Sequence, residues 1–323
     1  MTDPRQAVRP TRAEASLQHS PAAAPSPRHA LRLGLLLALL AVLLHGTAGL
    51  DATPSQGALA ADAVDPNAAS AEAFDHVRAG DWLADQGDRD GALRSYGVAR
   101  EMFRRLAAQD PANAEWQRGL AISDERLGDV HWDRGDLAGA ESSYGAALKV
   151  FERLAAQDPA DSDWQRSVSI SLTRIGDLLR AKGDLAGALQ RHAAALEIIE
   201  RLVALEPANA TWRRDLAVSH QRLGDLLWDK GDLDGALKRH TAALETAKHL
   251  ATQNPDDTGL QVDLAASHGK LGQLLKTMGE RDRAKAMFEK GRAILAPLAE
   301  GSDVALWRQY LRNFDAELEA LND

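Results

Sequence analysis

The chain has 323 residues, no cysteine and a net charge of −9. The absence of cysteine excludes disulfide bonds, thiolate nucleophiles and thiolate metal sites. The acidic balance argues against a general nucleic-acid binder, which would need a basic surface. Residues 1–48 carry a net charge of +3, so the remaining residues carry −12. A partner attracted to the folded region by charge is therefore expected to be basic or neutral.

The amino terminus has the composition of a targeting segment. Residues 1–30 are rich in Pro, Ala, Ser and Arg without hydrophobic periodicity, which predicts a disordered basic segment. An uncharged apolar run follows within residues 31–48. Two interpretations stay open: a signal peptide with Gly46 and Ala48 before the cut, or a membrane anchor, which needs about 18 apolar residues.

Both interpretations predict one topology, with the arginines of the front segment in the cytoplasm and the rest of the chain across the membrane. The expected location is thus the cell envelope, either periplasmic or secreted, or anchored by a single span. Membrane contact is expected only through residues 31–50, if they are retained. Residues 49–66, rich in Ala, Asp and Pro, are expected to be a linker to a repeat domain at 67–323.

The body of the chain repeats every 48 residues. Two columns of glycine, one of alanine, one of proline and one of tryptophan share this spacing. The columns are Gly80, Gly128, Gly176, Gly224 and Gly272; Gly87, Gly135, Gly183, Gly231 and Gly279; Ala92, Ala140, Ala188, Ala236 and Ala284; Pro111, Pro159, Pro207 and Pro255; and Trp116, Trp164 and Trp212. A fixed period of this kind indicates stacked structural units.

Each unit is predicted to be a hairpin of two helices, called A and B. In the third unit, Asp161 or Ser162 can cap helix A over about 163–182. Gly183 is expected to end that helix in the left-handed conformation, and Asp184 to cap helix B. The hairpins are expected near 68–110, 113–158, 161–206, 209–254 and 257–298, followed by a capping helix near 303–321. The fold class is therefore an all-α solenoid of about five antiparallel hairpins plus a C-terminal capping helix.

The small residues and the tryptophans have predicted packing roles. Gly176 and Ala188 are expected where helices A and B cross, because larger side chains would push the axes apart. The tryptophan column lies at the start of helix A. There each indole is expected to wedge against the preceding helix B.

These residues resemble the tetratricopeptide repeat family. Leu127-Gly128, Ala140, Tyr144, Ala147 and Pro159 follow the family's order of Leu-Gly, Ala, aromatic, Ala and Pro. The resemblance covers about residues 68–298, although His192 and His240 replace the aromatic residue in their repeats. The usual unit has about 34 residues, and the longer unit extends each helix by about two turns.

The resemblance implies a right-handed superhelix whose concave groove is lined mainly by the A helices. Such a groove binds a protein or a peptide, so the chain is expected to be a protein-interaction scaffold. Two columns are the candidate groove residues. They are Asp129, Asp177 and Asp225, with Trp132, Arg180 and Trp228 three positions further on.

Carboxylates with interleaved indoles would suit a partner that carries Lys or Arg. A structural alternative remains open, because Arg126–Asp129, Arg174–Asp177 and Arg222–Asp225 are each three apart on a helix and can pair there. Some family members clamp a terminal carboxylate with Lys and Asn. The matching columns here hold Asp129, Asp177 and Asp225, and Glu125, Thr173, Gln221 and Gly269, so that clamp is not implied.

No catalytic, cofactor or metal motif stands out in the sequence. His-Glu-x-x-His, the Gly-x-Ser-x-Gly elbow and the phosphate-binding Gly-rich loop are all missing. His220 and His268 occupy equivalent positions, but two histidines alone make a poor zinc site. We therefore expect no enzyme, no cofactor and no metal. Two alternatives to the scaffold stay open: an accessory envelope enzyme that uses groove carboxylates, and a self-assembling structural array.

Overall fold

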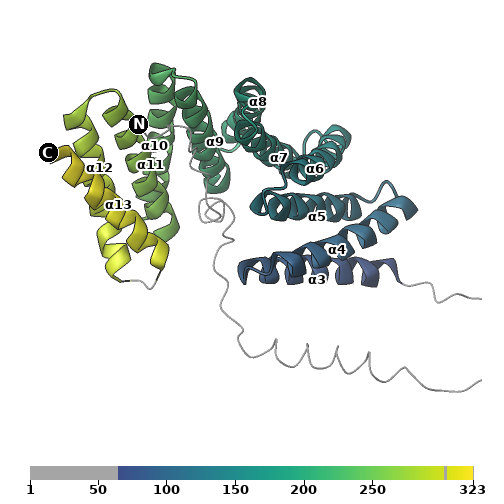
Figure 1. The fold of residues 1–323 in the computed structure, drawn as a ribbon. Coiled ribbons are helices and arrows are strands. Elements are labelled where there is room, and N and C mark those ends of the chain that lie inside the picture. Colours follow the sequence, from purple (N-terminus) through teal and green to yellow (C-terminus); the bar gives the residue numbers. More distant parts are fainter. Residues whose placement is uncertain (1–64, 302–303, 323) are drawn as a thin grey trace, which may run out of the picture. The chain divides into compact units, whose positions relative to one another are not determined.

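The computed structural model describes residues 65–301 and 304–322. Every secondary-structure element in these two ranges is a helix, and successive helices pack pairwise along the chain (Figure 1). The helices are α3 (Pro66–Asp85), α4 (Arg89–Gln109), α5 (Ala114–Asp133), α6 (Leu137–Gln157), α7 (Ser162–Ala181), α8 (Leu185–Leu205), α9 (Ala210–Asp229), α10 (Leu233–Gln253), α11 (Thr258–Thr277), α12 (Arg281–Glu300) and α13 (Ala305–Asn322). The predicted all-α solenoid is confirmed.

The predicted basic segment at 1–30, the signal peptide or anchor at 31–48 and most of the linker at 49–66 lie outside the described residues. The linker prediction also overlaps the start of α3, which begins at Pro66. Within the part of the chain that the structure describes, no helix is long and apolar enough to cross a membrane.

Glycine and aspartate set the turn inside each hairpin. The five glycines of the second column have φ between 76° and 85°, in the left-handed region where a side chain is strained. Asp184 then caps α8, because its carboxylate accepts a hydrogen bond from the backbone N–H of Gly187 at 2.9 Å. Asp161, rather than Ser162, caps α7. The predicted turn chemistry is therefore confirmed in the third repeat and recurs along the chain.

The predicted crossing of helices A and B is also confirmed. A Cβ atom added to Gly176 would lie 2.7 Å from Nε2 of His192, so a larger residue cannot fit without moving the ring. Ala188 is completely buried beside it. The first glycine column therefore packs directly against the aromatic column Tyr96, Tyr144, His192, His240 and Phe288.

The tryptophans pack as expected in two repeats, but less completely in the third. Trp116 and Trp212 are 8% and 6% exposed, and they contact the core residues of α4 and α8, the preceding B helices. Trp164 packs against the core around α6 but is only half-buried. Trp164 therefore packs on the preceding helix B, as predicted, but its side chain is not fully buried.

The last hairpin and the capping helix close the domain. Helix α12 continues through Pro297 to Glu300, two residues beyond the predicted end. Helix α13 lies against it, with Phe314 and Leu321 buried and Trp307 packed at the edge of the same core. An apolar core therefore runs to the C-terminal end of the described chain.

Candidate partner-binding face

The first candidate column is held by the B helix of its own repeat. The Tyr96 and Tyr144 hydroxyls donate to the carboxylates of Asp81 and Asp129, each at 2.8 Å. His192 and His240 occupy the tyrosine position in the next two repeats. Their Nε2 atoms lie 3.3 Å from Asp177 and 3.5 Å from Asp225. A column that the sequence marks as a groove candidate thus also joins helix A to helix B.

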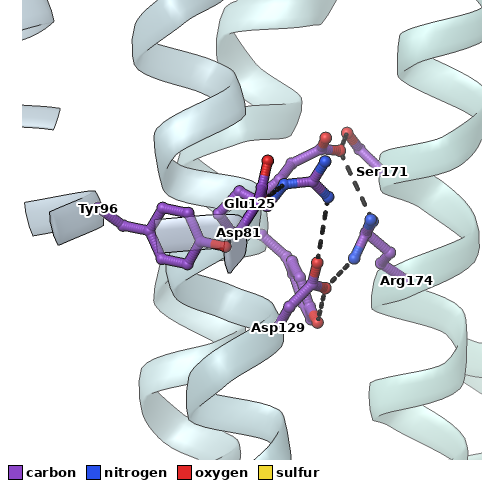
Figure 2. A network of polar contacts seen from close by, with 8 residues as sticks. Asp81, Tyr96, Glu125, Asp129, Ser171 and Arg174 are labelled. Carbon is purple, nitrogen blue, oxygen red and sulfur yellow. Dashed lines mark hydrogen bonds and ion pairs between the residues drawn. The ribbon is translucent and has the colours of Figure 1, made fainter. Parts of the chain in front are cut away.

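A cation from the following repeat contacts each of these carboxylates. Arg126 approaches Asp81 at 2.9 Å, and Arg174 pairs with Asp129. Arg222 approaches Asp177 and Lys270 approaches Asp225, each at 3.6 Å. We call these residues the ladder, and Figure 2 shows its first part. Its members are Asp81, Arg126, Asp129, Arg174, Asp177, Arg222, Asp225 and Lys270.

The predicted pairing along single helices is only part of this arrangement. Arg126 does contact Asp129 on its own helix, at 3.7 Å. Arg174 and Arg222, however, contact carboxylates one repeat earlier, because an arginine is long enough to reach the neighbouring A helix. The ladder therefore links successive repeats as well as stabilising individual helices.

Further polar contacts join the A helices in the first half of the ladder. Ser171 donates to Glu125 at 2.8 Å, and Arg174 lies 3.9 Å from the same carboxylate (Figure 2). The Arg174 guanidinium also stacks over the Tyr144 ring, 5.6 Å from its centroid. Two repeats later, at the equivalent positions, Gln221 donates to Ser267 at 2.9 Å.

Burial and neighbouring charges both shift the pKa values of these groups. Burial alone would raise the pKa of Asp177, but Arg222, His192 and Arg180 hold that pKa below its ordinary value. Burial raises the pKa of Tyr144, and the carboxylates of Glu125 and Asp177 raise it further, so this phenol stays protonated. Asp177 is therefore ionised at neutral pH, and its charge is balanced by neighbouring cations.

The second candidate column lies beside the ladder. Trp132, Arg180 and Trp228 are all half-buried. Trp132 packs against the core residues Ala140, Tyr144 and Leu178, and Trp228 meets His240 edge to face with ring centroids 6.4 Å apart. Arg180 pairs with Asp229 at 2.6 Å and with Asp225 at 3.8 Å. Each side chain thus contacts another part of the repeat domain and is also partly exposed.

The ladder ends in the last repeat. Gln273 replaces the aspartate and Phe288 replaces the tyrosine or histidine, so the carboxylate and the side-chain donor are lost together. Lys276, in the second column, reaches Glu317 of α13 at 2.7 Å. Within the described ranges 65–301 and 304–322, no group of three or more His, Asp or Glu side chains is arranged to hold a metal ion.

Comparison with protein-family models matches tetratricopeptide repeats at residues 84–130, 180–238 and 265–291. Comparison with curated protein sequences gave no significant match.

Two solved structures share the fold. BtubC (BKLC) from P. vanneervenii is 25% identical over 73% of this chain and 85% of its own, with a TM-score of 0.54. The apo form of RapI is 14% identical over 77% of this chain and 84% of its own, also with a TM-score of 0.54. The matched segments show that the chain contains tetratricopeptide repeats.

Proposed function

We propose that the chain is a protein-interaction scaffold that binds a protein or peptide along the face formed by the ladder and the second column. Tetratricopeptide repeats support the general role of protein binding. The proposal adds the place on the molecule. The partner would lie across successive A helices and contact Trp132, Arg180 and Trp228, which lie beside the ladder.

The observation that carries the proposal is the column of Trp132, Arg180 and Trp228. These residues stand in equivalent positions of three successive repeats, and each is half-buried. Trp and Arg are the side chains most often found to dominate the binding energy of protein interfaces. A partly buried indole already has a restricted conformation, so less entropy is lost when a partner covers it.

The aspartate column supports this face, but not by attracting a basic partner as the sequence predicts. Each aspartate lies beside a cation of the next repeat, so little uncompensated negative charge is left there to attract a basic partner. The ladder instead holds the A helices side by side. A face that is ordered before binding costs less to bind than one that must become ordered.

A comparison of tryptophan variants of the full-length chain tests the proposal. Trp132→Ala and Trp228→Ala together remove the indoles of the candidate face, while Trp82→Ala removes an exposed indole on another part of the domain. We expect proteins captured by the wild type from envelope extract to be lost with the double variant and kept with Trp82→Ala. Circular dichroism must first establish that all three proteins have the same helix content.

Equal capture by the wild type and the double variant would contradict the proposed face. Loss of capture with Trp82→Ala alone would move the site to the amino-terminal end of the repeats. If neither the wild type nor the double variant captured any protein, even after crosslinking, the result would count against the scaffold role itself.

We also propose that the repeats lie outside the cytoplasm. The apolar run within residues 31–48 and the arginines before it support this location. Alkaline phosphatase fused after Asp323 should be active in a bacterial host, because the enzyme needs export to form its disulfides. An inactive fusion with full expression would contradict the proposed location.

A further inference from the structure

A second series of ion pairs joins the beginnings of the A helices. Arg166 of α7 pairs with Asp215 of α9 at 2.5 Å, and Arg214 of α9 pairs with Asp263 of α11 at 2.7 Å. The four side chains are between 21% and 30% exposed, so these pairs are partly shielded from water. In both pairs the arginine contacts an aspartate 49 residues later.

The equivalent pair between α5 and α7 lacks its acid. Arg118 holds the arginine position, but Ser167 holds the position of the aspartate. The Ser167 hydroxyl donates to the backbone carbonyl of Asp163 in its own helix, at 2.8 Å. Arg118 is exposed, and among the described residues no acidic side chain forms an ion pair with it.

One step nearer the amino terminus, both partners of the pair are missing. Ser70 replaces the arginine and Gly119 replaces the aspartate. A hollow of about 400 Å³ opens between α3 and α5 at this point, and it is lined by Asn67, Ser70, Ala71, Phe74, Arg78 and Glu115. The Ser70 side chain is 6% exposed, and its hydroxyl has no hydrogen-bond partner within 65–301 and 304–322.

Phe74 gives this hollow an apolar wall. Its ring is half-buried and packs edge to face on Phe103, with ring centroids 4.7 Å apart. The hollow therefore combines an aromatic surface with a buried hydroxyl that lacks a partner.

We propose that Arg118 and the Phe74 hollow together bind an acidic peptide segment of a partner, and this inference rests on the function proposed above. A partner carboxylate would take the place beside Arg118 that Asp215 takes beside Arg166. An apolar side chain of the same segment would enter the hollow and cover Phe74.

Both parts of the site include residues of α5. Glu115, at the rim of the hollow, and Arg118 are three residues apart on α5, a rise of about 4.5 Å along the helix. Glu115 itself has a negative charge and would repel an acid inside the hollow. The acidic residue of the partner is therefore placed beside Arg118, and the apolar residue is placed in the hollow.

A peptide selection on the full-length protein tests the assignment. A phage-displayed library of random dodecapeptides is selected on the wild type and on three variants, and the recovered peptides are sequenced. Arg118→Ser removes the cation. Ser167→Asp supplies the missing acid from within the chain, so Arg118 becomes paired as Arg166 is. Arg201→Ser, which removes an exposed arginine of α8, is the matched control.

We expect peptides that contain Asp or Glu next to an apolar residue to be enriched on the wild type and on Arg201→Ser. The same peptides should bind about tenfold more weakly to Arg118→Ser and to Ser167→Asp, since one charge-assisted hydrogen bond is lost. Replacing the peptide's acid by its amide should weaken binding to the wild type by a similar factor. Trp82→Ala should change none of these affinities.

Acidic peptides that bind Ser167→Asp as well as the wild type would overturn the inference. Enrichment of basic or uncharged peptides that still require Trp132 and Trp228 would overturn it too, while leaving the proposed function standing. A library from which nothing is enriched on the wild type would count against both. Ser167→Asp adds a contact and Arg201→Ser removes only a surface charge, so both variants should stay folded. A loss of peptide binding can then be assigned to the site and not to unfolding.

Discussion

At the scale of single residues, the glycine of each Asp-x-x-Gly turn is explained by the aspartate before it. A Cβ atom on Gly187 would collide with the carboxylate of Asp184, which caps helix α8. The same pairing occurs before α4, α6 and α10. In the last repeat, Glu280 replaces the aspartate without making a cap hydrogen bond, and Arg283 replaces the glycine. The two positions change together because they share one space.

Removing one of these caps should therefore have a measurable cost. We expect Asp184→Ala to lower the free energy of unfolding by about 1 kcal/mol, because an N–H group at the start of α8 loses its acceptor. Glu280→Ala is the matched control and should have a smaller effect. Urea unfolding followed by circular dichroism measures both, and equal losses would contradict the role of the Asp184 cap.

The tryptophan column gives a second prediction at this scale. Trp116→Ala and Trp212→Ala should each cost about 3–5 kcal/mol, because both indoles are almost fully buried. Trp164→Ala should cost clearly less, since part of that ring already faces water. The three variants can be compared by their urea midpoints. A cost for Trp164→Ala as large as the other two would contradict the burial difference.

At the scale of helices, the 48-residue period is enough to predict the hairpins, but not the contacts between them. Turn glycines, caps and apolar faces are local signals, and they place each helix to within a few residues. The period aligns residues into columns without telling which columns touch. The spacing of Arg222 and Asp225 favours a pair within α9, whereas the structure places Arg222 beside Asp177 of α7.

The same limit applies to the candidate site. The sequence marks Asp129 and Trp132 as members of periodic columns, but the tyrosine that holds Asp129 lies on the other helix of the hairpin. Ser167 and Ser70 break the period instead of following it, so a search for columns passes over them. Sites formed by exceptions become visible only when the regular contacts around them are known.

The ladder should couple neighbouring repeats energetically. In a double-mutant cycle with Arg222→Ala and Asp177→Asn, we expect a coupling of about 1–2 kcal/mol, because both groups are largely shielded from water. The exposed pair Arg104 and Glu101 on α4 is the control and should give no measurable coupling. Additive effects of Arg222→Ala and Asp177→Asn would mean that the ladder contact does not stabilise the stack.

Buried histidines in the A helices should make stability depend on pH. Burial lowers the pKa of His220 to about 4, with a further lowering by Arg239. Burial also lowers the pKa of His268 to about 4, and Lys290 and Lys248 act in the same direction against Glu245. Because the folded pKa lies below that of the unfolded chain, stability is present above about pH 6.5 and is lost as the pH falls towards 4.

Replacing both histidines by leucine should weaken this dependence, since Leu172 occupies the equivalent position in α7 and is buried. The urea midpoints of the wild type and of His220→Leu with His268→Leu should be compared at pH 7.5 and pH 4.5. We expect the midpoint of the double variant to fall less between these values. An equal fall would mean that other groups cause the acid sensitivity.

At the scale of the repeat domain, the two ends of the described stack are built differently. Helix α13 covers the last repeat with buried Phe314 and Leu321. At the first repeat, the positions that pack on a preceding hairpin have become small or acidic. Ala68, Glu72 and Ala79 stand where α5 has Trp116, Leu120 and Leu127, and all three are exposed. A polar outer surface is the usual property of a terminal repeat.

Trp82 is the exception at this end. Its equivalents Val130, Leu178, Leu226 and Leu274 are at most 4% exposed, whereas Trp82 is 62% exposed. If the chain assembled end to end, as one alternative holds, this indole would be the apolar contact available on α3. The charge of Glu72, on the same helix, would have to be buried in such a contact, which costs free energy without a matching cation.

We therefore expect Trp82 to contribute little to stability or to self-association. Trp82→Ala should change the free energy of unfolding by no more than about 0.5 kcal/mol, because most of the ring contacts water already. Sedimentation velocity of the full-length wild type and of Trp82→Ala should give the same mass distribution at every concentration. Association that grows with concentration in the wild type and disappears in Trp82→Ala would favour the self-assembling array. Association that persists in both proteins would have to arise away from this end of the repeats.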